Sequence, residues 1–231
     1  MVRLLILAEG QSEEVFAKRT LIPHLHEFGV HAAVTVLRTK RIMSGGGFKG
    51  GVSSYEKIRK NLNELLGDTN ARVTTLLDFY GLPDEFPARG ETLEMPGLSA
   101  REKARRMQAA FAEDIGQPRF IPFLALHEFE AWLFSKPEVV AEHFGKEALT
   151  TALQGIVDEV GSPEEINNGP TTHPSVRIVG LVPQFKKTSD GPAIIHKMTL
   201  TNVRAACPHF DEWLTTLETL GNPAGAIQAV A

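Results

Sequence analysis

The sequence contains very little cysteine, since Cys207 is the single thiol in 231 residues. One thiol cannot close an intramolecular disulfide or supply a multi-cysteine zinc site, so a disulfide-stapled fold and a zinc ribbon are excluded. Such sparing use of cysteine is typical of a reducing compartment, and we expect a cytoplasmic protein. A chain of this length buries about 70% of its unfolded surface and needs no covalent crosslink to fold.

Long apolar runs are also lacking, because no stretch reaches the ~18 consecutive residues that a membrane span requires. We therefore expect no membrane association. The N-terminal apolar run, residues 3–8, is short, and the polar residues 9–14 follow it without a cleavage motif. This run predicts a buried first strand rather than a signal peptide.

A large excess of one charge is absent too, since 24 Lys and Arg face 28 Asp and Glu, for a net charge of −4. This balance excludes a generally polybasic binder but not local basic patches. Basic residues do cluster within 38–60, 101–106 and 177–187. Each cluster is either a solvated surface or a set of phosphate ligands. The candidates for binding substrate phosphates are Arg41, Lys49, Arg177 and Lys186.

The first half of the chain alternates strand-like and helix-like patterns. Expected strands cover 3–8, 31–37, 73–77 and 120–126, and expected helices cover 12–28, 53–66 and 99–114. This alternation predicts an α/β protein with a mostly parallel sheet flanked by helices. Ser12 is the expected N-cap of the first helix, and Gly29 is expected to end it.

After His127 the strand patterns nearly vanish, and the segments predict short helices packed on the sheet. We expect residues 1–126 to form the α/β core, 127–220 a helical subdomain of the same unit, and 221–231 a tail. Proline and glycine are expected to break the helices, at Pro137, Gly145, Pro163, Pro174, Pro183 and Pro208.

Three acidic residues stand where ligands gather in open parallel sheets, at the carboxyl ends of strands. Glu9 follows the first strand, Glu13 lies one turn into the next helix, and Asp78 ends the third strand. Hard carboxylate oxygens suit Mg²⁺ or Mn²⁺. The alternatives are that Glu13 and Glu14 only complement the helix dipole, and that Asp78 only starts a turn.

Residues 127–134, HEFEAWLF, lack the second histidine of the zinc-protease motif HExxH. On an α-helix Glu128 and Glu130 lie about 200° apart, so at most one of them is expected to join a shared site. His127 and Glu130 could instead form a structural hydrogen-bonded pair.

Two loops are also informative. The glycine-rich segment 44–51 is an expected flexible loop, and it lacks GxxxxGK[ST], so it is not a P-loop. Residues 167–175, NNGPTTHPS, predict a structured turn at the border of a pocket.

Several segments together resemble the bacterial family of unknown function DUF4276, in the same order and over nearly the whole chain. They are AEGQSE at 8–13, LDFYGLP at 77–83, LHEFEAWLF at 126–134, INNGP at 166–170, PSVRI at 174–178 and RAACPHFDEW at 204–213.

That family is similar to Toprim domains, which occur in topoisomerases, primases and OLD-type nucleases. The resemblance implies a Toprim-like fold in which Glu9 and Asp78 hold Mg²⁺. The sequence departs from the Toprim Asp-x-Asp pattern at position 80, where Tyr80 replaces the second aspartate. Glu128 or Glu130 is the best replacement ligand.

The leading prediction is a Mg²⁺- or Mn²⁺-dependent Toprim-like nuclease, with Glu9, Asp78 and Glu13 as catalytic residues and Glu9, Asp78, Glu128 and Glu130 as metal ligands. The resemblance also implies an ATPase partner and a role in mobile-element defence. The alternative is a degenerate module that binds nucleic acid, nucleotide or an ATPase without cleavage. A pure interaction scaffold is a third reading, and the sequence leaves homo-oligomerisation open.

Overall fold

The computed structural model describes residues 1–37, 54–167, 169 and 171–221. The strands run parallel in the order β2-β1-β3-β4, and β5 extends the pairing of β3. Their bounds are β1 (Val2–Ala8), β2 (Val30–Val36), β3 (Ala71–Asp78), β4 (Phe120–Ile121) and β5 (Leu124–Ala125). The expected mostly parallel sheet is therefore confirmed.

Helices connect the strands and make up nearly all of the regular structure after β5. The first half contains α1 (Gln11–Phe16), the π-helical η1 (Ala17–Leu21), α2 (Ile22–Glu27), α3 (Tyr55–Leu66), α4 (Arg89–Glu94) and α5 (Ala100–Ile115). The second half contains the 3-10 helices η2 (Phe129–Ser135) and η3 (Pro163–Glu165), with α6 (Pro137–Phe144), α7 (Ala148–Val160), α8 (Pro174–Leu181), α9 (Asp190–Met198), α10 (Leu200–Ala206) and α11 (Pro208–Thr219).

Proline and glycine punctuate the second half as the sequence indicates. Pro137, Pro174 and Pro208 each occupy the first position of a helix, where a missing N–H costs nothing. Gly145 ends α6 with φ 63°, a left-handed conformation that favours glycine. None of the helices in the described ranges is long and apolar enough to cross a membrane.

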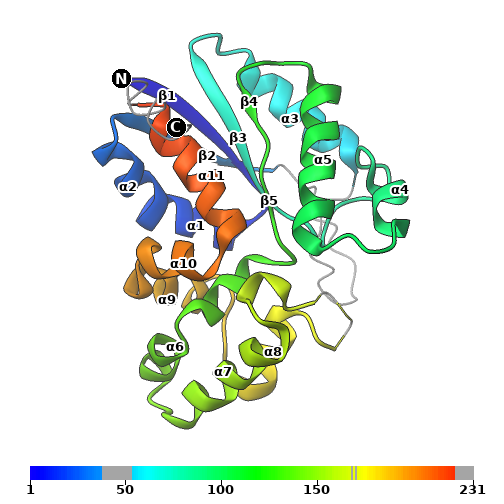
Figure 1. Ribbon diagram of the computed structural model, residues 1–231. Coiled ribbons are helices and arrows are strands. Elements are labelled where there is room, and N and C mark those ends of the chain that lie inside the picture. The colour runs from blue at the N-terminus through cyan, green and yellow to red at the C-terminus, as the bar shows by residue number, and fades with distance from the viewer. Residues whose placement is uncertain (38–53, 168, 170, 222–231) are drawn as a thin grey trace, which may run out of the picture.

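The sheet is covered on both faces (Figure 1). Helices α3 and α5 pack on one face, against side chains such as Leu7 and Val73. Helices α1, α2 and α11 cover the other face, against Leu4 and Ile6. Neighbouring residues of β1 thus point to opposite faces, which is why this strand is apolar almost throughout.

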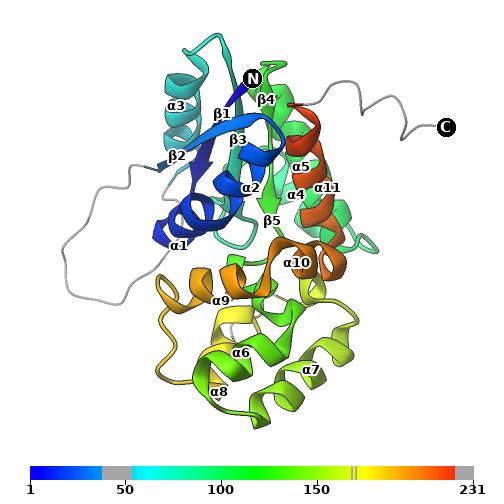
Figure 2. The ribbon, with the colours of Figure 1, turned by 90° about the vertical axis from the view of Figure 1, so that its left-hand side faces the viewer.

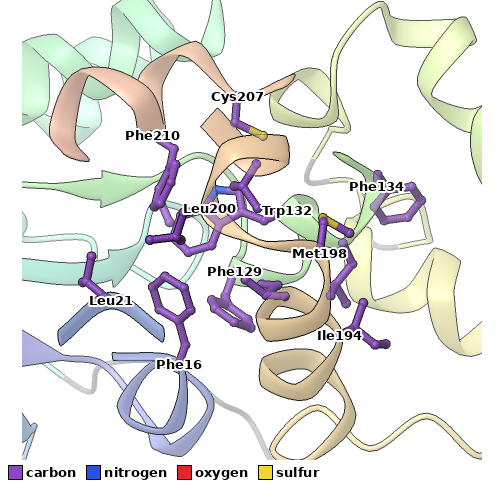
Figure 3. Packing of buried hydrophobic residues seen from close by; sticks show 14 of the residues in the cluster. Phe16, Leu21, Phe129, Trp132, Phe134, Ile194, Met198, Leu200, Cys207 and Phe210 are labelled. Carbon is purple, nitrogen blue, oxygen red and sulfur yellow. The ribbon is translucent and has the colours of Figure 1, made fainter. Parts of the chain in front are cut away.

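The helices of the second half lie beyond the carboxyl ends of the strands, and Figure 2 shows α6 to α9 below the sheet. An aromatic cluster joins them to the sheet layer (Figure 3). Phe16 of α1 contacts Phe129 and Trp132 of η2 at ring-centroid distances of 5.5 and 5.4 Å, and Trp132 contacts Phe210 of α11 at 4.6 Å. The carboxyl edge of the sheet therefore faces the packed helices of the second half.

Two local expectations are wrong. The N-cap of α1 is Gly10, not Ser12, which lies inside the first turn. The expected strand 120–126 is split into β4 and β5, because Pro122 has no N–H for the ladder. Side-chain hydrogen bonds from Thr75 take the place of backbone ladder bonds at this break. The Thr75 Oγ1 accepts from the Phe123 N–H at 2.9 Å and donates to the Phe123 carbonyl at 2.8 Å.

Candidate metal centre

Glu9 and Asp78 meet at the carboxyl ends of the neighbouring strands β1 and β3. The Asp78 N–H, at the end of β3, donates to Glu9 Oε2 at 2.9 Å. The backbone of β3 therefore holds the carboxylate of the residue that follows β1. Asp78 Oδ1 in turn accepts from the Phe129 N–H of η2 at 3.0 Å. The Glu9 side chain is therefore bound to the Asp78 backbone, and the Asp78 side chain is bound to the backbone of the helical half.

Glu13 caps the first helix and also lies beside Glu9. Its Oε2 accepts from the Gly10 N–H at 2.9 Å, which caps α1, and its side chain is buried beside Glu9. Glu14 points elsewhere, with an ion pair to Lys18 at 2.6 Å. Of these two acids, only Glu13 belongs to the cluster.

Glu128 and Glu130 both reach this site, so the expectation that at most one could do so is wrong. Lys187 Nζ lies 3.5 Å from Glu128 Oε1 and 3.4 Å from Glu130 Oε2. The 100° rule fails because Glu128 is extended (φ −147°, ψ 157°) and the helix that follows it is a 3-10 helix. The preceding residue, His127, has φ 62° and turns the chain there.

The suggested pair of His127 with Glu130 is not formed. Both ring nitrogens of His127 are buried without a partner among the described residues. Burial lowers the pKa of this histidine to about 4, so the ring is neutral at physiological pH.

Lys187 belongs to the basic cluster 177–187, but the sequence analysis did not single it out as a site residue. It precedes α9, and its ammonium is the cation that interacts with the acidic cluster, although its side chain is 47% exposed. The neighbouring Lys186, the expected phosphate ligand, has no side-chain partner within the described part of the chain. Its hydrogen bonds are made by the backbone: the Lys186 N–H donates to Asp190 Oδ2 at 2.8 Å, and the Lys186 carbonyl accepts from the Asp190 N–H at 2.8 Å. Adjacent lysines look alike in a sequence, so no local pattern distinguishes the two.

The electrostatics of the cluster favour protonated acids when no cation other than Lys187 is present. Burial raises the pKa of Glu9, Glu13 and Glu130 to about 7 each. Burial and the neighbouring carboxylates raise the pKa of Asp78 well above its usual range. Burial opposes ionisation of Glu128 as well, but Lys187 and hydrogen bonds from Ser175 lower its pKa. A divalent cation would relieve this repulsion and stabilise the ionised acids.

The donor set therefore fits Mg²⁺ or Mn²⁺ in its chemistry, because all five side chains are hard carboxylates. As the side chains are positioned, no three or more His, Cys, Asp or Glu of the described residues form a group that could hold a metal ion. Protein donors engage the carboxylates instead: Glu9, Glu13 and Asp78 accept from backbone N–H groups, and Glu128 and Glu130 contact Lys187. Metal binding at this site requires these carboxylates to reorient.

His173 and Ser175, from the segment 167–175, lie beside Glu128. Glu128 Oε2 accepts from the Ser175 N–H at 3.0 Å and lies 3.2 Å from His173 Nδ1. Tyr80 also lies here, but its ring is 41% exposed and stacks on His173. Position 80 thus supplies an exposed aromatic ring rather than a further carboxylate.

Arg177, another candidate phosphate ligand, makes its contacts away from the acidic cluster. Arg177 Nε donates to the Thr172 carbonyl at 2.7 Å, and its Nη1 lies 3.7 Å from Glu159, so this guanidinium braces the start of α8. Arg41, Lys49 and the glycine-rich segment 44–51 lie outside the described residues.

A substitution at Gly81 can displace the Glu9 carboxylate, because the two residues lie close together. A Cβ at residue 81 would lie 3.1 Å from Glu9 Oε1, whereas a Cβ at Gly90 in α4 would meet nothing within 4 Å. We expect Gly81→Ala to push the Glu9 carboxylate off the Asp78 N–H and to weaken Mn²⁺ binding about tenfold, or ~1.4 kcal/mol. Gly90→Ala is the matched control and should bind Mn²⁺ as the wild type does. Isothermal titration of both variants checks this, and equal affinities would contradict it.

The fold and the site define an α/β protein with a carboxylate cluster at the carboxyl edge of a parallel sheet. The chain belongs to the family DUF4276, described as a domain of unknown function, whose sequence profile matches residues 8–218. The family resemblance seen in the sequence is thereby confirmed.

Further comparisons identify distant structures only. No curated protein matches the sequence. The C-terminal region of the OLD protein of Xanthomonas campestris pv. campestris, in its platinum-phased structure, is 16% identical and has a TM-score of 0.38, with 93% of this chain and 95% of that chain covered. The iodine-phased structure of the same region is 18% identical with a TM-score of 0.36, covering 94% and 97%. Scores this low support no conclusion about site or function.

Proposed function

We propose that this protein is a Mg²⁺- or Mn²⁺-dependent phosphodiesterase that acts on nucleic acid. One observation carries the proposal: Glu9, Glu13, Asp78, Glu128 and Glu130 converge with Lys187 at the carboxyl edge of the sheet. Burying so many acids together is costly, and such clusters of perturbed carboxylates occur mainly at functional sites.

Each residue has a role that follows from its place. Glu9 and Asp78, which are held in register by a hydrogen bond between β1 and β3, would be the central metal ligands. Glu13, Glu128 and Glu130 surround them and would complete the donor set. A bound Mg²⁺ would polarise the phosphate and activate a water molecule. The half-exposed Lys187 would donate hydrogen bonds to the phosphate oxygens once its two glutamates turn to the metal.

Nucleic acid is proposed as the substrate because of the resemblance to Toprim domains, whose Glu and Asp positions correspond to Glu9 and Asp78. The same resemblance supports a partner ATPase and a role in mobile-element defence. Purification with any ATPase encoded beside this protein, followed by gel filtration of the mixture, tests the partnership.

A second candidate function is a module that binds nucleic acid, nucleotide or an ATPase without cleavage. The observation that favours it is Tyr80, which contributes no carboxylate where the Toprim pattern has its second aspartate. In this alternative Lys187 stays paired with Glu128 and Glu130.

Cleavage of labelled single- and double-stranded DNA and RNA in Mg²⁺ or Mn²⁺ distinguishes the two functions. We expect Glu9→Gln and Asp78→Asn each to reduce cleavage at least ~100-fold, since each removes a ligand charge from the cluster. Glu14→Gln, which alters an acid outside the cluster, is the control and should cleave normally. Nucleic acid that is bound but never cleaved, with or without the ATPase, would replace the nuclease by the binding module.

A further inference from the structure

Tyr80 is an exposed aromatic side chain at the edge of the acidic cluster. It follows Asp78 by two residues, and its backbone N–H donates to the His127 carbonyl at 3.1 Å, which anchors the turn. The other tyrosine of the chain, Tyr55, instead packs its ring edge against Phe86 and Phe111. Tyr80 is 41% exposed, and its ring stacks on that of His173, with centroids 5.6 Å apart and planes 21° from parallel.

His173 ties this stack to the acids. Its Nδ1 lies 3.2 Å from Glu128 Oε2 and 3.1 Å from Ser175 Oγ, and these contacts fix the orientation of the imidazole ring. On the other side of Tyr80 along the chain, Gly81 abuts the Glu9 carboxylate. The two-residue step from Asp78 to Tyr80 spans at most ~7 Å, which is comparable to one nucleotide.

We propose that Tyr80, backed by His173, is a stacking platform for an unpaired base, so that the site acts on single-stranded nucleic acid or on frayed ends. This inference rests on the proposed function. An aromatic face tolerates any base, because every base has a π-face. A base inside a duplex is already stacked on both sides and cannot reach the platform without being flipped out of the helix. The platform therefore predicts a preference for single strands rather than for a sequence.

Fluorescence anisotropy with three 12-mer probes in Ca²⁺ tests the platform. The probes are oligothymidylate, an abasic strand with the same phosphates, and a blunt duplex. We expect the wild type to prefer oligothymidylate, and Tyr80→Ala to weaken that binding about tenfold while leaving binding of the abasic strand unchanged. Tyr80→Phe keeps the ring and should bind as the wild type does.

Phe28→Ala is the matched control. Phe28 is also an exposed aromatic beside a histidine, with its ring centroid 5.0 Å from that of His24, but it lies at the amino-terminal edge of the sheet. It should leave all three affinities unchanged. Equal losses for Tyr80→Ala on the oligothymidylate and abasic probes, or tighter binding of the duplex, would overturn the platform. Absence of binding to every probe would overturn it as well.

The failure of the platform and the failure of the proposed function give different results. If Glu9→Gln abolishes cleavage while Tyr80→Ala binds oligothymidylate normally, the nuclease stands and the platform falls. If nothing is cleaved but Tyr80→Ala loses the single strand selectively, the platform stands on a binding module.

Discussion

Saturating Mn²⁺ is expected to raise the melting temperature of this protein by about 8 °C at pH 8 and by much less at pH 5.5. Mn²⁺ at ~100 times its Kd adds about 2.7 kcal/mol, and 1 kcal/mol corresponds to about 3 °C in a chain of this size. Metal must displace protons from Glu9, Glu13 and Glu130, whose pKa values burial raises to about 7. Its affinity therefore rises with pH.

In the metal-free protein, the contribution of these acids to folding stability falls as the pH rises. An acid with a raised pKa in the folded state contributes stability that is complete below its unfolded pKa and is lost as the pH rises to about 7. Burial lowers the pKa of His127 and of His209 to about 4. The contribution of these two histidines to folding stability therefore rises with pH. They titrate in both metal-free and metal-loaded protein, so they cancel in the shift that Mn²⁺ causes.

Differential scanning fluorimetry of three proteins checks this prediction. Glu9→Gln should lose the Mn²⁺ response, while Glu14→Gln should keep it, because Glu14 pairs with Lys18 outside the cluster. A shift of equal size at pH 5.5 and pH 8, or an undiminished shift in Glu9→Gln, would show that Mn²⁺ binds elsewhere.

Replacing Lys187 by methionine is expected to reduce Mn²⁺-dependent cleavage at least ~100-fold. The loss of one well-placed donor to a charge that develops in the reaction typically has such an effect. The same change should also destabilise the metal-free protein at pH 8 by about 2 kcal/mol. This loss of stability lies between that expected for breaking a surface ion pair and that for breaking a buried one. The reason is that Lys187 is half-exposed while its two partners are buried.

Lys186→Met is the matched control, because it removes the same charge at the neighbouring position. The Lys186 side chain has no partner among the described residues. This variant should leave cleavage and stability nearly unchanged. Urea unfolding with and without Mn²⁺ separates the two effects of Lys187→Met, because added metal should restore most of the lost stability but not the activity. Equal behaviour of the two variants would remove Lys187 from the site.

Local patterns in the sequence determined much of the fold. Apolar runs and helical periods predicted β1, β2 and β3, and parallel pairing follows from the helices between them. Capping chemistry also acts locally: the helix expected from residue 99 begins there, with the Ser99 side chain accepting from the Glu102 N–H. The meeting of Glu9 and Asp78 was predictable for the same reason, because parallel strands end at one edge.

The tertiary structure alone decided the rest of the site. Glu128 and Glu130 both join the cluster because φ 62° at His127 and a 3-10 helix replace the α-helix that the sequence suggests. Lys187 contacts Glu128 and Glu130 from 59 and 57 residues away, and Tyr80 stacks on His173 across an even longer separation in the chain. Sequence periodicity carries information over one or two turns, whereas these contacts depend on how whole elements pack. The sequence by itself therefore determined the sheet and its first two acids, and the packing of the helical half determined which lysine, glutamates and aromatic ring complete the site.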